Sequence, residues 1–356
     1  MAHHPAIAIP TPRLLMWQRV RQYAEPPSMI ETATARRAAG DWAGACAAAR
    51  IDVDLDVRAV RDRHGTDLAT RLRADLRRLA PDLLRWHMPR IAPDGRLRPG
   101  LTLSLARYRG SGTLTPQLVV RTPPARADAG QRMSLALWDG PGDRAAPGNH
   151  PHPHPDRRFR LDLHPHLWDA GRSGELARRC GAVGAPYGAP PDRPAGHGDP
   201  WAVARWAAEA EHLLRAEGRS RGGAFSVRLG ARNHAVLELV APDDNHVPTC
   251  RPPSGALSRQ RAAALPVLPE VAARVLPDLE LLRAGLVAPE RLHPLVAAAL
   301  APAYRSARVA GTAPEPRRWH RPTARHGWPV PPPSPPTPTG SSAGARSTGS
   351  PCGTGC

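Results

Sequence analysis

The sequence predicts an α+β fold, and three changes of pattern along the chain support this class. Between residues 29 and 100 apolar residues recur with the 3.6-residue period of helices, and from Leu101 to Leu163 they recur at every second position. After Gly198 a second helical pattern is followed by a hairpin pattern. We therefore expect a mostly irregular segment 1–28, a helical region 29–100, an α+β region 101–304 and a disordered tail 305–356 rich in Pro, Gly and Arg.

The composition is strongly basic and excludes several kinds of chemistry. The 356 residues include 49 basic and 31 acidic side chains, a formal charge of +18, and all 49 basic residues are arginine. A chain without lysine cannot form a Schiff base with pyridoxal phosphate and cannot contain the GxxxxGK[ST] phosphate loop. No apolar run approaches the roughly 18 residues of a membrane helix, and the N-terminus lacks the apolar core of a signal peptide. We expect a soluble, cytoplasmic protein with no membrane partner.

Helices are predicted first, from capping residues and apolar spacing. Arg13–Tyr23 is a short helical candidate. Ser28 and Glu31 have the spacing of a capping box, which predicts a helix from Met29 to Gly40, and Asp41 can cap a second helix that ends at Ala49. Thr66 is expected to cap a third helix, and DLLRWHM, between two prolines, forms one or two further turns. The third helix has one apolar stripe, formed by Leu68, Leu72, Leu76 and Leu79.

The next elements are predicted to be strands. Apolar residues on one side and polar residues on the other indicate an antiparallel β-meander with one solvated face. Its strands are expected at 101–107, 117–122, 132–138 and 158–163.

A Pro/Gly loop, 181–198, separates the meander from the last elements. Asp199 and Pro200 predict the start of a helix that ends near Glu217 and packs on the sheet. Its buried stripe is expected to contain Val203, Trp206, Ala207, Ala210, Leu213 and Leu214. A β-hairpin follows at 225–229 and 235–240, and short helices are expected at 270–275, 277–284 and 289–300.

Histidines form the most conspicuous cluster of chemically active side chains. Imidazole is a common ligand of zinc, nickel and copper, so these residues are candidate metal ligands. Alternating prolines hold the first three apart, and no Cys or HExxH glutamate completes a tetrahedral set. We therefore expect no stoichiometric metal. The candidates are His150, His152, His154, His164 and His166.

Other candidate sites are weaker still. The run IDVDLD from Ile51 to Asp56 could bind a metal, although a solvated strand or the entry to a helix explains it better. No GxSxG or GxGxxG motif is present, so we assign no catalytic residue and no cofactor. Eleven arginines against five aspartates between residues 57 and 100 allow contacts to phosphates, so a nucleic-acid-associated protein with Arg-rich surfaces is the alternative function.

One resemblance adds to this interpretation. The segments ATARRAAGDWAGACAAARIDVDLD, LAPDLLRWHMPRIAPDGRLRPGLTLSLARY and PDLELLRAGLVAPERLHPLVAAAL make residues 12–304 resemble an uncharacterised family of high-GC actinobacteria with no assigned activity. Residues 29–50 also resemble a single tetratricopeptide-type helical hairpin, without a second copy. The resemblance implies that ordered sequence continues beyond residue 304, so a frameshifted or truncated end is one explanation of the tail.

The leading expectation is a non-enzymatic protein-interaction or accessory protein with an unknown protein partner. The small-residue hairpin at 29–50 supports it, because such packing units often serve contacts between proteins. An unrecognised enzyme is the third reading.

Overall fold

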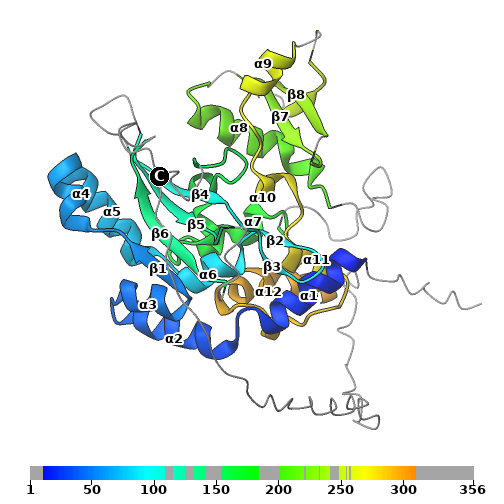
Figure 1. The fold of residues 1–356 in the computed structure, drawn as a ribbon. Coiled ribbons are helices and arrows are strands. Elements are labelled where there is room, and N and C mark those ends of the chain that lie inside the picture. The colour runs from blue at the N-terminus through cyan, green and yellow to red at the C-terminus, as the bar shows by residue number, and fades with distance from the viewer. Residues whose placement is uncertain are drawn as a thin grey trace, which may run out of the picture. The chain divides into compact units, whose positions relative to one another are not determined.

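The computed structural model describes residues 11–108, 115–124, 131–140, 154–183, 200–219, 222–231, 233–240, 248–253, 255 and 258–309. Helices and sheets alternate along these residues, which confirms the predicted α+β class (Figure 1). Most of the predicted loop 181–198 and the predicted tail from residue 310 onward lie outside the described residues. Residues 305–309 were expected in the tail, but they continue the last helix instead.

The N-terminal half contains the predicted helices. Their bounds are α1 Pro12–Tyr23, α2 Pro27–Ala38, α3 Trp42–Ala48, α4 Val57–His64, α5 Thr66–Arg78 and α6 Pro81–Trp86. Asp41 caps α3 as predicted, because its carboxylate accepts a hydrogen bond of 2.8 Å from the amide of Gly44. The predicted capping box of α2 is wrong. Pro27 occupies the first helical position, where its missing N–H costs nothing, so Ser28 already lies inside the helix. Thr66 is likewise the first residue of α5 rather than its cap, which is Gly65.

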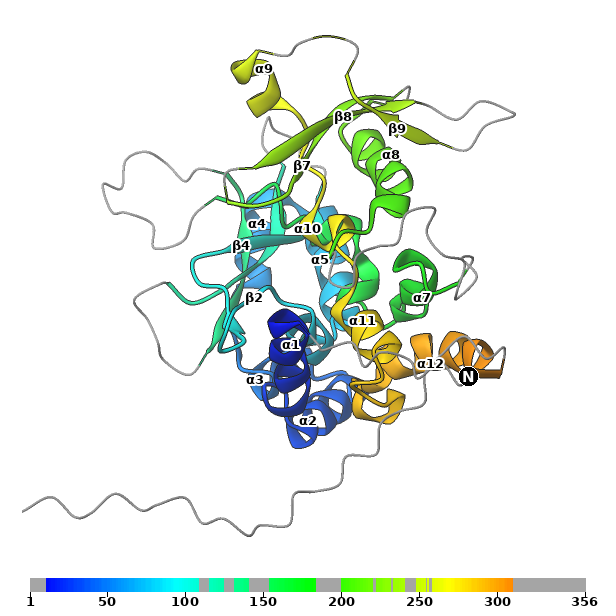
Figure 2. The ribbon, with the colours of Figure 1, turned by 90° about the vertical axis from the view of Figure 1, so that its right-hand side faces the viewer.

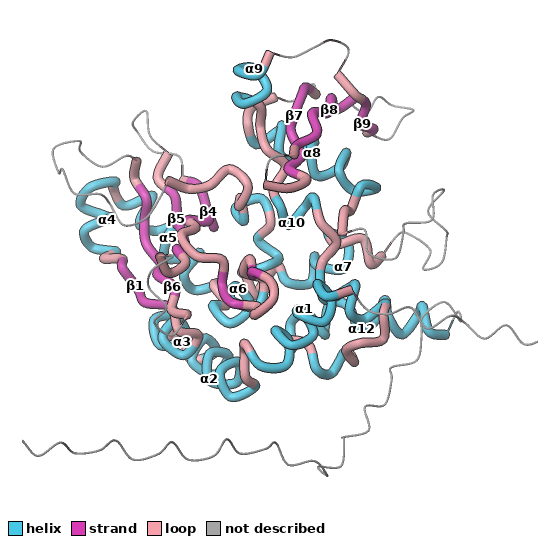
Figure 3. The backbone as a smooth tube through the Cα atoms, turned by 45° about the vertical axis from the view of Figure 1, so that its right-hand side comes forward, coloured by secondary structure: helices cyan, strands magenta, loops and turns pink. Residues whose placement is uncertain are grey.

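A four-stranded sheet follows, with the strand order β1-β6-β5-β4. Its strands are β1 Ile51–Asp54, β4 Thr102–Arg107, β5 Gln117–Arg121 and β6 Met133–Trp138. The antiparallel pairing of β4, β5 and β6 confirms the meander. The acidic run supplies β1, which lies parallel to β6 with Ile51 opposite Met133 (Figure 3).

The predicted solvated face of this sheet is wrong for its first two strands. Thr102 and Ser104 are buried as completely as Leu103 and Leu105, and all of β5 is buried. The chain after β6 returns alongside β4 and pairs with the edge of β4 that faces away from β5. The amide of Ser104 donates to the carbonyl of Phe159 (3.2 Å), and the amide of Asp156 donates to the carbonyl of Thr102 (3.0 Å).

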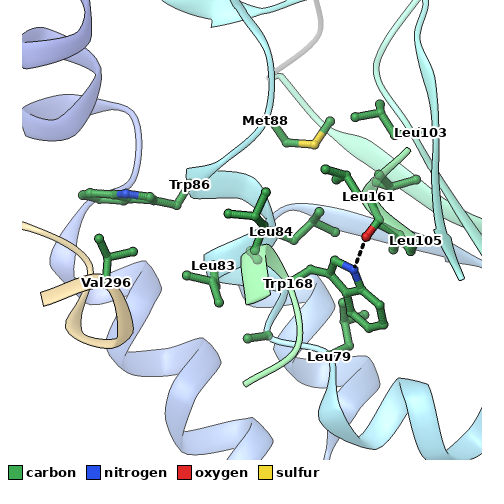
Figure 4. Packing of buried hydrophobic residues seen from close by; sticks show 14 of the residues in the cluster. Leu79, Leu83, Leu84, Trp86, Met88, Leu103, Leu105, Leu161, Trp168 and Val296 are labelled. Carbon is green, nitrogen blue, oxygen red and sulfur yellow. Dashed lines mark hydrogen bonds between the residues drawn. The ribbon is translucent and has the colours of Figure 1, made fainter. Parts of the chain in front are cut away.

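The predicted fourth strand, 158–163, is also wrong. Arg160 makes one isolated bridge to Ser104, and then the chain forms two short 3₁₀ turns, Leu161–Leu163 and Pro165–Leu167. Pro165 cannot donate to a strand ladder, so the strand stops before it. Phe159 and Leu161 pack instead into the core around α6, where the indole of Trp168 donates to the carbonyl of Leu161 (3.1 Å; Figure 4), and Leu163 packs against a separate apolar cluster.

A second sheet contains the predicted hairpin. It comprises β7 Gly223–Arg228, β8 His234–Val240 and the unpredicted β9 Thr249–Arg251. Helix α8, Trp206–Ala216, packs on this sheet as expected. It begins six residues later than predicted, because Trp201 pairs with Arg274 and residues Val203–Arg205 form a 3₁₀ turn. Val203 is therefore 58% exposed and does not belong to the buried stripe.

The remaining elements are short except the last helix, which was expected at 289–300 and spans the 16 residues Pro294–Val309. They are β2 Arg90–Ile91, β3 Arg96–Leu97, α7 Leu176–Arg179, α9 Arg259–Ala264, α10 Glu270–Ala273, α11 Pro277–Arg283 and α12 Pro294–Val309. None of the helices in these described parts has the length and apolarity that crossing a bilayer requires.

The apolar side chains form two clusters. The larger cluster gathers around α6 and includes Trp86, Met88, Leu103 and Val296 (Figure 4). The smaller cluster joins α8 to the second sheet and to α10. The hairpin and the chain after the meander contribute to different clusters: Phe225 and Val227 lie in the smaller cluster, and Phe159 and Leu161 lie in the larger one.

Candidate functional site

A cavity of about 530 Å³ lies between α1, the β2–β3 hairpin and the α10–α11 connection. Its volume is within the range of about 300–1,000 Å³ that is usual for small-molecule sites. Much of the wall is apolar. The apolar wall residues are Met16, Trp17, Met88, Ile91, Leu103, Phe159, Leu161, Val271, Val275 and Leu276.

Helix α1 closes one side of this pocket through contacts with α11 (Figure 2). The guanidinium of Arg21 donates to both carboxylate oxygens of Asp278, at 2.8 and 2.7 Å, and to the carbonyl of Trp86 at 2.7 Å. It also lies over the ring of Trp86, 4.3 Å from the centroid. All three side chains are buried, so this cluster fixes α1 against α6 and α11.

A glycine brings the β2–β3 hairpin against α1. Gly95 has φ +71°, and a Cβ placed there would lie 2.3 Å from Cγ2 of Val20. Only glycine combines this backbone conformation with such a close approach. The hairpin and α1 therefore form adjoining walls of the pocket.

Six arginines line the pocket against one carboxylate, that of Glu270. Four of the six are neutralised by carboxylates that do not line the cavity. These pairs are Arg13–Glu280, Arg21–Asp278, Arg90–Glu25 and Arg158–Asp156.

The remaining two arginines, Arg98 and Arg274, share Glu270. The nitrogen–oxygen distances are 3.6 Å from Arg98 and 3.4 Å from Arg274. Both are longer than the roughly 2.7–2.9 Å of a strong charge-assisted hydrogen bond. The Nε atom of Arg274 is buried and has no hydrogen-bond partner among the described residues. Positive charge is therefore incompletely neutralised at this part of the wall.

The position of Arg274 is fixed by an aromatic ring. Its guanidinium lies 4.4 Å from the ring centroid of Trp201, and the two residues form a backbone bridge. Burial lowers the pKa of Arg274, and Glu270 opposes that shift. Because an arginine stays protonated at neutral pH even so, the pocket keeps a fixed cation in its wall.

His87 adds a neutral imidazole to the same wall. Its Nδ1 lies 3.1 Å from the carbonyl of Leu83 and 3.2 Å from that of Leu167, so Nδ1 carries the proton. Its Nε2 is buried without a hydrogen-bond partner among the described residues. Burial lowers the pKa of His87 to about 4, which keeps the ring uncharged at neutral pH.

A second hollow, of about 480 Å³, is a weaker candidate because its charges satisfy one another. Asp75 accepts from Arg78 (2.6 Å) and from the hydroxyl of Tyr108 (2.8 Å). Asp169 also lies 3.2 Å from Arg78, and Asp162 accepts from Arg160 at 2.8 and 2.7 Å. Little unneutralised charge is left for a ligand.

The three candidate histidines that the structure describes do not form a metal site. His154 is exposed, with its ring 6.0 Å from that of Trp138, and His150 and His152 lie outside the described residues. His164 and His166 are buried beside each other, with ring centroids 5.7 Å apart. Among the residues that the structure describes, no group of three or more His, Cys, Asp or Glu could hold a metal ion.

The two buried histidines are held neutral. Burial lowers the pKa of His164 to about 3, although Glu209 opposes the shift, and burial also lowers the pKa of His166. Nε2 of His164 and Nδ1 of His166 have no hydrogen-bond partner in the described part of the chain. Arg179 donates to Glu209 at 2.8 Å and lies 3.2 Å from Nδ1 of His164.

All three carboxylates of the acidic run Ile51–Asp56 have structural contacts. Asp52 pairs with Arg132, Asp54 lies 3.5 Å from Arg121, and Asp56 caps α4 by accepting from the amide of Arg58 (2.8 Å).

The arginines of α5 and α6, which are candidates for phosphate contacts, differ in burial and pairing. Arg85 is buried and lies 3.6 Å from Glu25, and Arg78 pairs with Asp75 and Asp169. Arg73 and Arg77 are exposed on α5. The side chains thus separate into buried, paired and exposed groups.

Sequence reasoning missed the pocket residues. Arg98 and His87 lie far from Glu270 and Arg274 in the chain, and no motif connects the two pairs; Glu270 and Arg274 have the i,i+4 spacing of a helical ion pair, a signal that could have indicated their contact. The sequence also does not indicate the cis peptide bond between Ala92 and Pro93 in the β2–β3 turn.

Comparisons with known proteins give no further guidance. No protein-family model, no curated protein and no solved structure matches this chain. The functional argument therefore depends on the geometry of the pocket.

Proposed function

We propose that this protein binds an amphipathic organic anion in the pocket beside α1. The observation that carries the proposal is an apolar cavity of about 530 Å³ in whose wall two arginines share one carboxylate. An apolar ligand body would replace water against Trp17, Phe159 and Leu161, and an oxyanion head would accept charge-assisted hydrogen bonds from Arg98 and Arg274.

The proposal keeps the expected non-enzymatic role. A binding site of this kind needs no nucleophile and no cofactor, and it gives the accessory function a chemically defined partner. The alternative of nucleic-acid binding stays a prediction. Arg78 and Arg85 are paired with carboxylates, and this pairing does not favour contacts with phosphates.

Isothermal titration of the full chain with three eight-carbon probes tests the proposal. We expect octanoate to bind with one site per chain, 1-octanol to bind at least about 10-fold more weakly, and octylamine to give no binding. The reason is that a hydrogen bond to a charged group contributes about 1.5–3 kcal/mol, or roughly 10- to 100-fold in affinity. Equal affinity for octanoate and 1-octanol, or no binding of any probe, would contradict the proposal.

Two variants locate the site. Ile91→Trp narrows the cavity and should abolish octanoate binding, and Arg274→Gln should weaken it by at least about 10-fold. Arg178→Gln is the matched control, because Arg178 is exposed and does not line the pocket.

A further inference from the structure

Glu270 occupies an unusual position for a residue that lines an anion-binding pocket. It begins α10, its side chain is 29% exposed, and it faces two guanidinium groups at once. The lining arginines outside this trio have carboxylate partners elsewhere, so Glu270 provides the negative charge within the cavity wall.

The contacts of Glu270 are looser than those of the neighbouring ion pairs. Its oxygens lie 3.4 Å and 3.6 Å from the arginine nitrogens, whereas Arg13 approaches Glu280 to 2.7 Å and Arg158 approaches Asp156 to 2.6 Å. The nearest nitrogen, Nε of Arg274, makes no hydrogen bond to any described residue. Glu270 therefore offsets part of the charge of the two arginines without accepting a hydrogen bond from either of them.

Resting on the proposed function, we infer that Glu270 is a built-in competitor for the ligand's head group, and that this head group is a carboxylate. A bound carboxylate would take over Arg98 and Arg274 as hydrogen-bond acceptor, and the side chain of Glu270 would turn toward solvent. The displaced group and the arriving group carry the same charge and the same planar shape, so the exchange leaves the net charge around the two arginines unchanged.

The backbone of Glu270 supports such an exchange. Its amide donates to the carbonyl of Arg158 at 2.8 Å, so the main chain stays anchored while the side chain moves. Arg274 is held by Trp201 and by the bridge between the two residues, so the cation remains in place when its carboxylate partner leaves.

The test compares octanoate binding by the full-length wild type, Glu270→Gln and the control Glu290→Gln, each with a melting curve that shows it is folded. Glu290 is exposed and does not line the pocket. We expect Glu270→Gln to bind octanoate about 10-fold or more tightly than wild type, since the competing charge is gone, and Glu290→Gln to match wild type. Neither variant should bind octylamine more tightly than wild type does.

A double variant separates competition from a general change of shape. If Glu270 acts by holding Arg98 and Arg274, the gain from Glu270→Gln should shrink at least severalfold in the Arg274→Gln background. Octanoate binding by wild type with equal or weaker binding by Glu270→Gln would overturn the inference and leave the proposed function standing. Absence of binding in both would overturn the proposed function itself.

Discussion

At the scale of single residues, the chain uses arginine where buried cations are needed. The guanidinium of Arg21 reaches Asp278 with two nitrogens, Trp86 with a third and the indole ring with its face. The three-donor ammonium of a lysine could not make this planar set of contacts. Trp86 completes the cluster by donating from Nε1 to the same carboxylate at 3.0 Å.

Replacing Arg21 should show how strongly this cluster depends on charge balance. Arg21→Met leaves Asp278 buried without its cation, which typically costs about 3–5 kcal/mol in the free energy of unfolding. The double variant Arg21→Met/Asp278→Leu should recover part of the loss, because no unpaired charge remains. Urea denaturation of the three proteins measures both effects, and a double variant less stable than Arg21→Met would contradict the argument.

The buried histidines should make the protein sensitive to acid. The pKa of His87 is about 4 and that of His164 about 3, whereas in the unfolded chain both titrate near the ordinary value of about 6.5. Below about pH 6.5 the unfolded state therefore binds protons that the folded state does not, and the free energy of unfolding falls. Each histidine should contribute up to about 1.4 kcal/mol per pH unit between pH 6 and pH 4.

Thermal melts between pH 7 and pH 4 check this expectation. His87→Asn and His164→Asn should each make the fall in melting temperature with acid shallower, and His234→Asn, at an exposed position, should leave it unchanged. A profile as steep in both buried-site variants as in wild type would show that other groups control the acid response.

At the scale of elements, one turn fixes the distance between two walls of the pocket. Gly95→Ala should lower the free energy of unfolding for two reasons. The positive φ costs about 1–2 kcal/mol, and the close contact with Val20 costs about 1–3 kcal/mol. Gly40→Ala is the matched control: its φ is +78°, and a Cβ there meets nothing within 4 Å. Equal losses in the two variants, measured by urea denaturation, would argue against tight packing of the hairpin on α1.

Helix α8 should depend on Trp206, which is 8% exposed and donates from its indole to the carbonyl of Ala273 at 2.9 Å. Trp206→Ala should cost about 3–5 kcal/mol. The helical pattern places Arg205 on the solvated side of this helix. In the structure Arg205 is half-buried and lies 3.7 Å from Glu209. Arg215→Ala is the better control, since its exposed pair with Glu211 contributes only about 0.3–0.5 kcal/mol. Equal melting temperatures for the Trp206 variant and wild type would refute the core position.

The elements that the sequence predicts well are those whose stability is local. Asp41 and the stripe of Leu68, Leu72 and Leu76 act within one or two helical turns, so their meaning can be read from neighbouring residues. Segment 158–163 has an alternating pattern too, but Pro165 and the contacts with β4 decide its conformation, and those contacts come from elsewhere in the chain.

The pocket could not be predicted for a related reason. Its charge pattern arises because Arg98, Arg274 and Glu270 meet in space, whereas in the sequence they are three charged residues among many. In a chain whose 49 basic residues are all arginine, the identity of an arginine carries little information. Only burial and pairing distinguish those at the site.

At the scale of the whole molecule, ligand binding and folding should be linked. A ligand that binds only the folded state at 100 times its Kd adds about 2.7 kcal/mol to the free energy of unfolding. Octanoate at that concentration should therefore raise the melting temperature of wild type by several degrees. Arg274→Gln at the same octanoate concentration should show a clearly smaller rise, and an equal rise in both proteins would place the bound octanoate elsewhere.

The contact between α1 and α11 also determines when the pocket can fold during synthesis of the chain. Gln18 donates to the carbonyl of Leu286, a partner 268 residues further along the chain. At a translation rate of about 5–20 residues per second, α1 waits roughly 13–54 s before that partner exists. For nearly all of this interval Arg21 lacks Asp278, and the wall that contains Trp17 lacks its contacts with α11. The pocket is thus assembled late, because α1 waits for α11, the last but one of the described α-helices.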